Sequence, residues 1–170
     1  LCAYAQLIDE EVRVTPKSPA HEEWMELALA EASDTTHTHD VPVGAIVVDA
    51  QGNVIGRGRN RREESGDPTA HAEVLALRNA AAHRGTWRLD DVTLIVTLEP
   101  CAMCAGTILA ARVPRLVFGA WDDKAGAVGS VYDLLRDRRL PHRVEVTTGV
   151  RTDECAELLT AFFRDSPTIP

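Results

Sequence analysis

The chain has 170 residues, of which 45% are apolar and 26% are charged, enough to form and solubilise a core of ordinary size. This excludes a disulfide-stabilised miniprotein and a disordered tail. The formal charge of −8, from 18 Lys and Arg against 26 Asp and Glu, argues at first against a nucleic-acid partner. Residues 1–40, however, hold nine acids and two bases and so account for −7, which leaves −1 for residues 41–170.

The sequence gives no sign of a membrane segment. No stretch approaches the roughly 18 consecutive apolar residues of a membrane span, and the first residues lack the pattern of a secretion signal. We therefore expect no membrane partner and a cytoplasmic location. Cys2, Cys101, Cys104 and Cys155 are too few and too unevenly spread for a disulfide framework, so the close pair Cys101 and Cys104 points to metal or redox chemistry.

The chain reads as one domain over residues 18–164, with a flexible extension over 1–17 and a short tail over 165–170. Within the domain, hydrophobic periodicity, prolines and glycines predict ten elements in the order α β β α β α β α β α. They are a helix from Pro19, strands at Val43–Ala50 and Val54–Arg59, a helix at about 70–83, a strand at Val92–Thr97, a helix entered at Pro100, a strand at Arg115–Gly119, a helix at Ser130–Arg138, a strand at Val144–Thr148 and a helix at Asp153–Phe163. This order predicts an α/β fold with helices on both faces of a central sheet.

Two short motifs carry candidate chemistry. His71 and Glu73 stand at the start of one predicted helix, and Cys101 and Cys104 stand at the start of another. One imidazole and two thiolates are three good Zn²⁺ ligands that leave a fourth tetrahedral position for water, as in catalytic zinc sites. Glu73 is not needed as a ligand, and its carboxylate can act as general base and then general acid.

Each motif has a plainer interpretation. A CxxC pair also occurs in redox proteins and structural zinc sites, and a histidine at a helix start is commonly a cap or a surface residue. The conjunction of both motifs at two helix starts favours the catalytic zinc site. Glu99, just before Pro100, is expected to be a structural partner at the helix entrance, and Cys155 a core residue.

Three runs of sequence resemble the bacterial tRNA-specific adenosine deaminases of the cytidine deaminase superfamily. They are DPTAHAEVLALRNAA, VTLEPCAMCAGTILAARVPRLVFGAWDDKAG and DECAELLTAFF, and the similarity extends from about His21 to Arg164. The HxE and PCxxC motifs form the signature of the zinc deaminases. The resemblance implies a three-layer α-β-α, cytidine-deaminase-like fold with a central five-stranded mixed sheet.

The resemblance also implies an activity, a cofactor and partners. The activity is hydrolytic deamination of the wobble adenosine to inosine in the anticodon loop of an arginine tRNA with an ACG anticodon. One Zn²⁺ per subunit, held by His71, Cys101 and Cys104, would activate the water that attacks C6 of adenine, with Glu73 moving the protons. Asn60 matches the family's base-contacting asparagine and Asp122 the aspartate that contacts the sugar region. The implied partners are the tRNA anticodon stem-loop and a second subunit in a homodimer.

The residues that bind RNA are expected to depart from the family pattern. Trp121 stands where a basic residue is expected beside Asp122, and the end of the chain lacks the usual run of Arg and Lys. Possible tRNA contacts lie around Asn60 and beside Asp122; they are Arg57, Arg59, Arg61, Arg62, Trp121 and Lys124. The arginine-rich loop beside Glu63 and Glu64 can equally be a solvated surface.

Two other functions stay open. A free-base or nucleoside deaminase for guanine or cytosine would share the zinc site, and a non-catalytic zinc-stabilised binding module would keep the metal without the reaction. Three features favour the tRNA enzyme over the first of these: Asn60, the context of Asp122 and the predicted Ser130–Arg138 helix. The helix would return the last strand parallel to its neighbour and open the pocket to a polymer.

Overall fold

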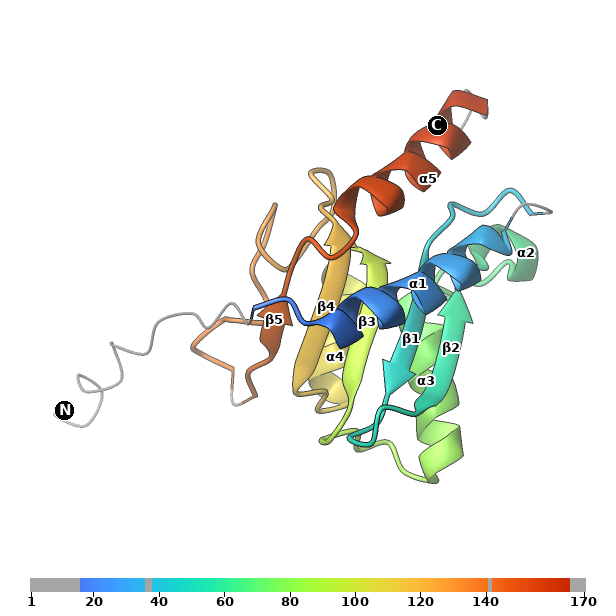
Figure 1. Ribbon diagram of the computed structural model, residues 1–170. Helices are drawn as coiled ribbons and strands as arrows, with labels where there is room; N and C mark the ends of the chain where they lie inside the picture. The colour runs from blue at the N-terminus through green and yellow to red at the C-terminus, as the bar shows by residue number, and fades with distance from the viewer. Residues whose placement is uncertain (1–15, 36–37, 141, 166–170) are drawn as a thin grey trace, which may run out of the picture.

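A computed structural model describes residues 16–35, 38–140 and 142–165 of the chain (Figure 1). A five-stranded mixed sheet with strand order β2-β1-β3-β4-β5 forms its centre. The first two strands, β1 (Gly44–Val48) and β2 (Val54–Arg59), make an antiparallel hairpin, and β1 is also antiparallel to β3 (Thr93–Leu98). The last two, β4 (Arg115–Ala120) and β5 (Glu145–Thr147), continue the sheet in parallel with β3. The expected mixed sheet is confirmed.

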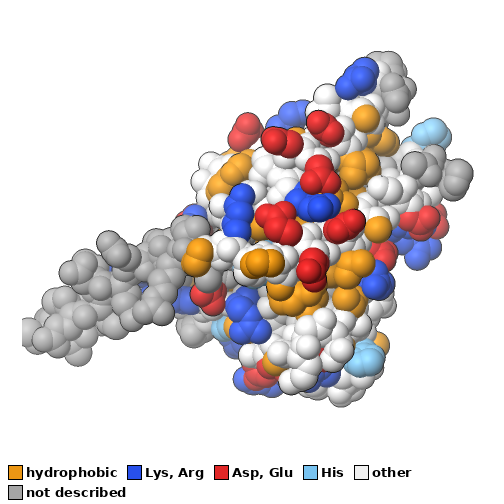
Figure 2. Space-filling view, in the orientation of Figure 1, with side chains coloured by type: hydrophobic (Ala, Val, Ile, Leu, Met, Phe, Trp, Pro, Cys, Tyr) orange, Lys and Arg blue, Asp and Glu red, His pale blue; other side chains and the backbone are white. Residues whose placement is uncertain are grey.

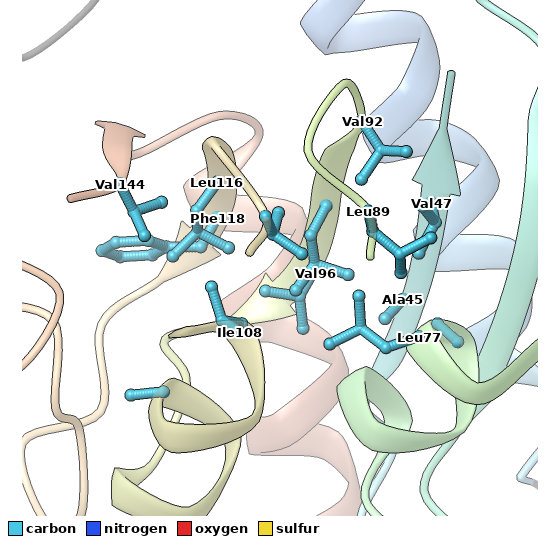
Figure 3. Close-up of a cluster of buried hydrophobic side chains, with 14 of the residues drawn as sticks. Ala45, Val47, Leu77, Leu89, Val92, Val96, Ile108, Leu116, Phe118 and Val144 are labelled. Atoms are coloured by element: carbon cyan, nitrogen blue, oxygen red, sulfur yellow. The ribbon is translucent and has the colours of Figure 1, made fainter. Parts of the chain in front are cut away.

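Helices cover both faces of this sheet, as Figure 1 shows. On one face lie α1 (Pro19–Ser33) and α5 (Thr152–Asp165), which pack on a buried cluster that includes Ile95 and Cys155. On the other face lie α3 (Ala72–Arg84) and α4 (Ala102–Ala110), which pack on a larger cluster (Figure 3). The three-layer α/β fold is confirmed, and so is the buried position of Cys155.

Local sequence explains where the first helix begins. Ser18 is the N-cap of α1, and its hydroxyl accepts a hydrogen bond from the backbone N–H of His21 at 3.3 Å. Pro19 follows at the first helical position, where its missing N–H costs nothing. The apolar face predicted from the periodicity is buried through Met25 and Leu29.

The predicted helix at Ser130–Arg138 is wrong. Between β4 and β5, the described residues 121–140 and 142–144 form no helix, and isolated β-bridges, among them Cys101 with Gly126, fix part of this segment. The backbone N–H groups of Val128 and Ser130, just before and at the start of the predicted helix, donate to the buried carboxylate of Glu99. The last strand is nevertheless parallel to β4. The argument that this helix opens the pocket to a polymer therefore fails.

Other differences are small. The segment expected to be loop between Asn60 and Thr69 contains a short helix, α2 (Arg62–Ser65). The expected extension over 1–17 and tail over 165–170 lie almost wholly outside the described residues. In the part of the chain that the structure covers, no helix is long and apolar enough to cross a membrane.

Candidate metal and catalytic site

The two predicted motifs meet at one edge of the sheet. His71 is the N-cap residue of α3 and Cys101 is the N-cap residue of α4, so both helices begin at the edge where β2 and β3 end. Each of the two has an extended backbone, and neither uses its side chain to cap its own helix. Both side chains are therefore free to converge with that of Cys104, which lies one turn into α4.

The three side chains form a group with the dimensions of a zinc site. The Sγ atoms of Cys101 and Cys104 are 3.7 Å apart, and they lie 3.7 Å and 3.5 Å respectively from Nδ1 of His71. A tetrahedral zinc with bonds of about 2.3 Å to sulfur and 2.0–2.1 Å to nitrogen places two sulfurs about 3.8 Å apart and a sulfur about 3.5 Å from a nitrogen. The residues present therefore fit zinc without rearrangement and leave a fourth position for another ligand.

The electrostatics of the group favour a thiolate. The hydrogen bond between the two sulfurs, and then the hydrogen bond with the ring of His71, lower the pKa of Cys101 to about 3. The same bond, together with burial and the nearby Glu73, raises the pKa of Cys104. The hydrogen bond with Cys101, and then the charge of Glu73, raise the pKa of His71. Metal binding would release the proton that the two sulfurs share, since both ligate as thiolates.

Glu73 is the carboxylate beside this group. It lies in the first turn of α3, is only 4% exposed and interacts with the side chain of Cys104. Burial raises the pKa of Glu73 to about 7, against an opposing effect of its own backbone N–H. A carboxyl with such a pKa can both accept and donate a proton near neutral pH.

A pocket of about 220 Å³ is lined by three of these side chains, His71, Glu73 and Cys101, and by two more predicted residues, Asn60 and Asp122. Nδ2 of Asn60 donates to the carbonyl of Val41 at 3.2 Å, which turns Oδ1 the other way. Asn60 is 8% exposed, and its Oδ1 is a buried side-chain atom with no hydrogen-bond partner among the described residues. A buried acceptor without a donor costs free energy, so this atom is suited to a donor on a bound molecule.

Asp122 belongs to a loop that a second carboxylate holds. Its own side chain accepts hydrogen bonds from the backbone N–H groups of Lys124 and Ala125, at 3.0 Å and 3.2 Å. Its backbone N–H donates to Glu99, which is 2% exposed. The expectation that Glu99 is a structural partner at the helix entrance is confirmed.

Three of the four arginines expected near RNA have acidic partners. Arg57 pairs with Glu31 at 3.0 Å, and Arg61 pairs with Glu64 at 3.0 Å. Arg59 pairs with Asp34 at 3.1 Å and with Glu64 at 2.7 Å. These ion pairs match the plainer interpretation of the loop, although RNA contact stays a prediction.

Arg62 differs from the other three. It lines the pocket and is exposed, and within the described ranges no carboxylate pairs with it. Figure 2 shows acidic and basic side chains interspersed over the face of α1 and α5, with no continuous basic patch there. Of the four arginines, Arg62 is therefore the best candidate for a contact with RNA.

Trp121 and Lys124 do not line the pocket, although each is next in sequence to a residue that does, Asp122 and Ala125 respectively. Trp121 is 45% exposed and packs edge-on against the buried Phe118, with ring centroids 4.8 Å apart. The ammonium of Lys124 lies 5.9 Å from the ring centroid of Phe163 in α5. Of the two alternatives for Trp121, packing is observed, and contact with a nucleotide stays a prediction.

One residue that holds the site escaped the sequence analysis. Asp40 is 1% exposed, and its two carboxylate oxygens accept from the backbone N–H groups of Glu63 at 2.7 Å and Glu64 at 3.2 Å. It thus caps α2 and orients the segment that carries Asn60 and Arg62. No local signal in the sequence could identify it, because a helix cap is normally sought next to the helix rather than more than twenty residues before it.

Comparison with known proteins agrees with this geometry. The family model for the cytidine and deoxycytidylate deaminase zinc-binding region matches residues 18–120. The tRNA-specific adenosine deaminase of Haemophilus influenzae is 47% identical over 148 residues, which cover 87% of this chain and 86% of that protein. A solved structure from a study of A-to-I editing by tRNA:A34 deaminases at the wobble position is 44% identical, with a TM-score of 0.77, and covers 81% of this chain and 99% of its own. The guanine deaminase of Nitrosomonas europaea is 27% identical, with a TM-score of 0.69, over 88% of this chain and 86% of its own.

Proposed function

The chain belongs to the tRNA-specific adenosine deaminases of the cytidine and deoxycytidylate deaminase family, and we propose that it converts the wobble adenosine of an arginine tRNA to inosine with the help of zinc. The observation that carries the chemistry is the convergence of His71, Cys101 and Cys104 beside the buried Glu73, at a pocket that His71, Glu73 and Cys101 line. The choice of tRNA as substrate rests on the named relatives at 44–47% identity.

The reaction replaces the 6-amino group of adenine by oxygen, with water consumed and ammonia released. Zinc held by His71, Cys101 and Cys104 would act as a Lewis acid that lowers the pKa of water to about 7. Glu73 accepts a proton from the attacking water and delivers it to N1 of the ring. It then moves a proton to the departing amino group, which leaves as ammonia. A carboxyl with a pKa near 7 suits both transfers.

Two pocket residues are proposed to hold the nucleotide. Oδ1 of Asn60 accepts a hydrogen bond from a donor on the target nucleotide, which satisfies the buried atom described above. Asp122 contacts the sugar region from the opposite loop. The exposed guanidinium of Arg62 lies at the pocket, where it can meet a backbone phosphate.

We also propose that the active protein is a homodimer. An apolar groove of about 450 Å³ lies between α3 and α4, and its lining includes Leu77, Met103 and the 59% exposed Trp87. Met103 stands between the two cysteines of the site, so a second copy seated in this groove would lie beside the pocket. Light scattering should give twice the chain mass, and Trp87→Glu should give monomers. A monomeric wild type would contradict the proposal.

A guanine deaminase is the second candidate, because the Nitrosomonas europaea enzyme has the same fold. Its identity of 27% is well below that of the tRNA-specific relatives. The zinc chemistry would be the same, so only the substrate separates the two functions.

One assay decides between them. The zinc-loaded protein is incubated with an arginine tRNA transcript bearing the ACG anticodon, with its isolated anticodon stem-loop, and with free guanine, adenosine and cytidine. We expect inosine at the wobble position of both RNAs and no turnover of free bases or nucleosides. Turnover of guanine with an unmodified tRNA would overturn the proposal.

A further inference from the structure

Glu99 is a buried charge without a cationic partner. Its residue is 2% exposed, and none of the ion pairs of the described residues includes it. A carboxylate buried in this way is strongly destabilising unless hydrogen bonds replace the lost water. The question is therefore which donors Glu99 binds and what they hold in place.

The donors are three backbone N–H groups of one loop, residues 122–130. Oε1 accepts from Val128 at 2.9 Å and from Ser130 at 3.1 Å, and Oε2 accepts from Asp122 at 3.1 Å. The hydroxyl of Ser130 then donates to the carbonyl of Asp122 at 2.7 Å, which ties the two ends of the 122–130 loop to each other. A single carboxylate thus fixes both ends of the loop.

The loop and the carboxylate fit each other closely at Gly126. A methyl group on this glycine would overlap the Glu99 carboxylate and the Ser130 hydroxyl. The N–H of the next residue, Ala127, donates to the carbonyl of Pro100 at 2.8 Å, and Gly126 itself bridges to the metal-ligand position Cys101. The carboxylate therefore needs a residue without a side chain opposite it.

The 122–130 loop forms one wall of the pocket through Asp122 and Ala125, while Glu99 stands two residues before Cys101. The carboxylate thus connects the strand end that carries the metal-ligand motif to the opposite wall of the same pocket. Glu99 itself also lines the pocket, and both of its carboxylate oxygens accept backbone N–H groups of the loop.

We propose that Glu99 is a positioning residue, whose buried carboxylate binds the 122–130 loop and so sets the distance of Asp122 from the metal-ligand group. The proposal rests on the proposed function for its kinetic consequence only. The hydrogen bonds of the loop can be tested without any activity.

The main variant is Glu99→Gln, which keeps the size of the side chain but turns one acceptor into a donor facing backbone N–H groups. By hydrogen–deuterium exchange, amides in the 121–131 peptide should exchange roughly 10- to 100-fold faster, the range expected for loss of a hydrogen bond to a charged group. The exchange rates of the β3 amides should be unchanged, and the zinc content per chain should equal that of the wild type.

The kinetics should separate positioning from chemistry. With the anticodon stem-loop as substrate, KM should rise about 10-fold or more, whereas kcat should fall less, because the metal group and Glu73 are unaltered. Gly126→Ala should reproduce this pattern with the carboxylate intact, and the double variant should be little worse than either single one. Asp49→Asn is the matched control, since Asp49 accepts two backbone N–H bonds in the remote β1–β2 turn, and it should leave KM unchanged.

Unchanged exchange in the 121–131 peptide of both Glu99→Gln and Gly126→Ala would overturn the proposal. Faster exchange of this peptide with wild-type KM would overturn it as well. Should Glu99→Gln fail to fold, Gly126→Ala alone supplies both readouts. A wild type that makes no inosine from any tRNA would instead refute the proposed function, and the exchange comparison would still decide whether Glu99 holds the loop.

Discussion

Glu73, the proposed proton-transfer residue, shows what burial does to a carboxyl group. Water around an exposed glutamate would keep its pKa near 4.5, and such a group could not hold a proton at neutral pH. At 4% exposure, burial raises the pKa of Glu73 to about 7. Burying this carboxyl costs free energy, but it gives Glu73 a pKa at which the group can both accept and donate a proton near neutral pH.

The role of Glu73 predicts a sharp difference between its loss and the loss of a ligand. Glu73→Gln should keep one zinc per chain and lower kcat by about 100- to 10,000-fold, the range of general acid–base catalysis. Metal analysis and single-turnover assays on the same preparation measure both quantities. Retained deaminase activity would show that Glu73 is not the proton-transfer group. Zinc binding and biological function that both survive the substitution, with no deamination even by the wild type, would support the zinc-stabilised binding module instead. Cys104→Ala is the comparison variant and should lose the metal as well.

Cys155 shows the opposite use of burial. Cys155 lies on the buried side of α5, where its thiol packs against Gly119. Burial raises the pKa of this thiol to about 12. Because the raised pKa keeps the thiol protonated, labelling of Cys155 by iodoacetamide should stay negligible and should not increase between pH 7 and pH 9. Mass spectrometry of native and urea-unfolded protein measures this, with full labelling expected only after unfolding. Rapid labelling of the native protein would contradict it.

At the scale of elements, short segments around the site are ordered by distant side chains. The four-residue α2 has no side-chain cap of its own, and Asp40 supplies the acceptors for its first N–H groups. Residues 122–130 are held in the same way, because the carboxylate of Glu99 accepts hydrogen bonds from three of their backbone N–H groups. In both places one carboxylate from another part of the chain decides the local backbone.

The α2 cap leads to a prediction on stability. Asp40→Ala should lower the free energy of unfolding by about 1–2 kcal/mol, the usual cost of losing a helix cap. It should also weaken tRNA binding, because α2 carries Arg62. Urea denaturation gives the first value and filter binding the second. Asp90→Ala removes an exposed carboxylate paired with Arg88, and it should change stability by less than about 0.5 kcal/mol.

At the scale of the whole molecule, the distribution of charge matters more than its sum. Most of the −8 lies in residues 1–40, and several of those acids pair with arginines of the sheet, as Glu31 does with Arg57. An arginine whose guanidinium is already paired with a carboxylate is expected to bind a phosphate more weakly. The unpaired Arg62 at the pocket is therefore expected to matter more for RNA than its neighbours.

Two arginine variants test this expectation with the same change in net charge. Arg62→Ala should reduce the slope of log affinity for tRNA against log salt by about 0.7–0.9, as for one lost phosphate contact. Arg57→Ala should change the slope by less than half as much. Equal effects would mean that net charge, rather than the position of Arg62, controls binding.

The sequence by itself determined the layers of the fold and the chemistry of the site. Hydrophobic periodicity and the positions of prolines and glycines predicted α1, the strands and the two long helices of the other face, because these elements bury residues that are close together in sequence. The spacing of His71 with Glu73 and of Cys101 with Cys104 predicted the metal group and its base, since each pair stands at one helix start.

Only the tertiary structure decided the walls of the pocket. It replaced the predicted helix at Ser130–Arg138 by a loop held by Glu99, introduced Asp40 as a cap, and left Oδ1 of Asn60 without a partner. It also paired three of the four predicted arginines with acids. Except for the local pair of Arg61 with Glu64, these features depend on hydrogen bonds and ion pairs between segments roughly 20 or more residues apart. Local periodicity contains no information about such contacts.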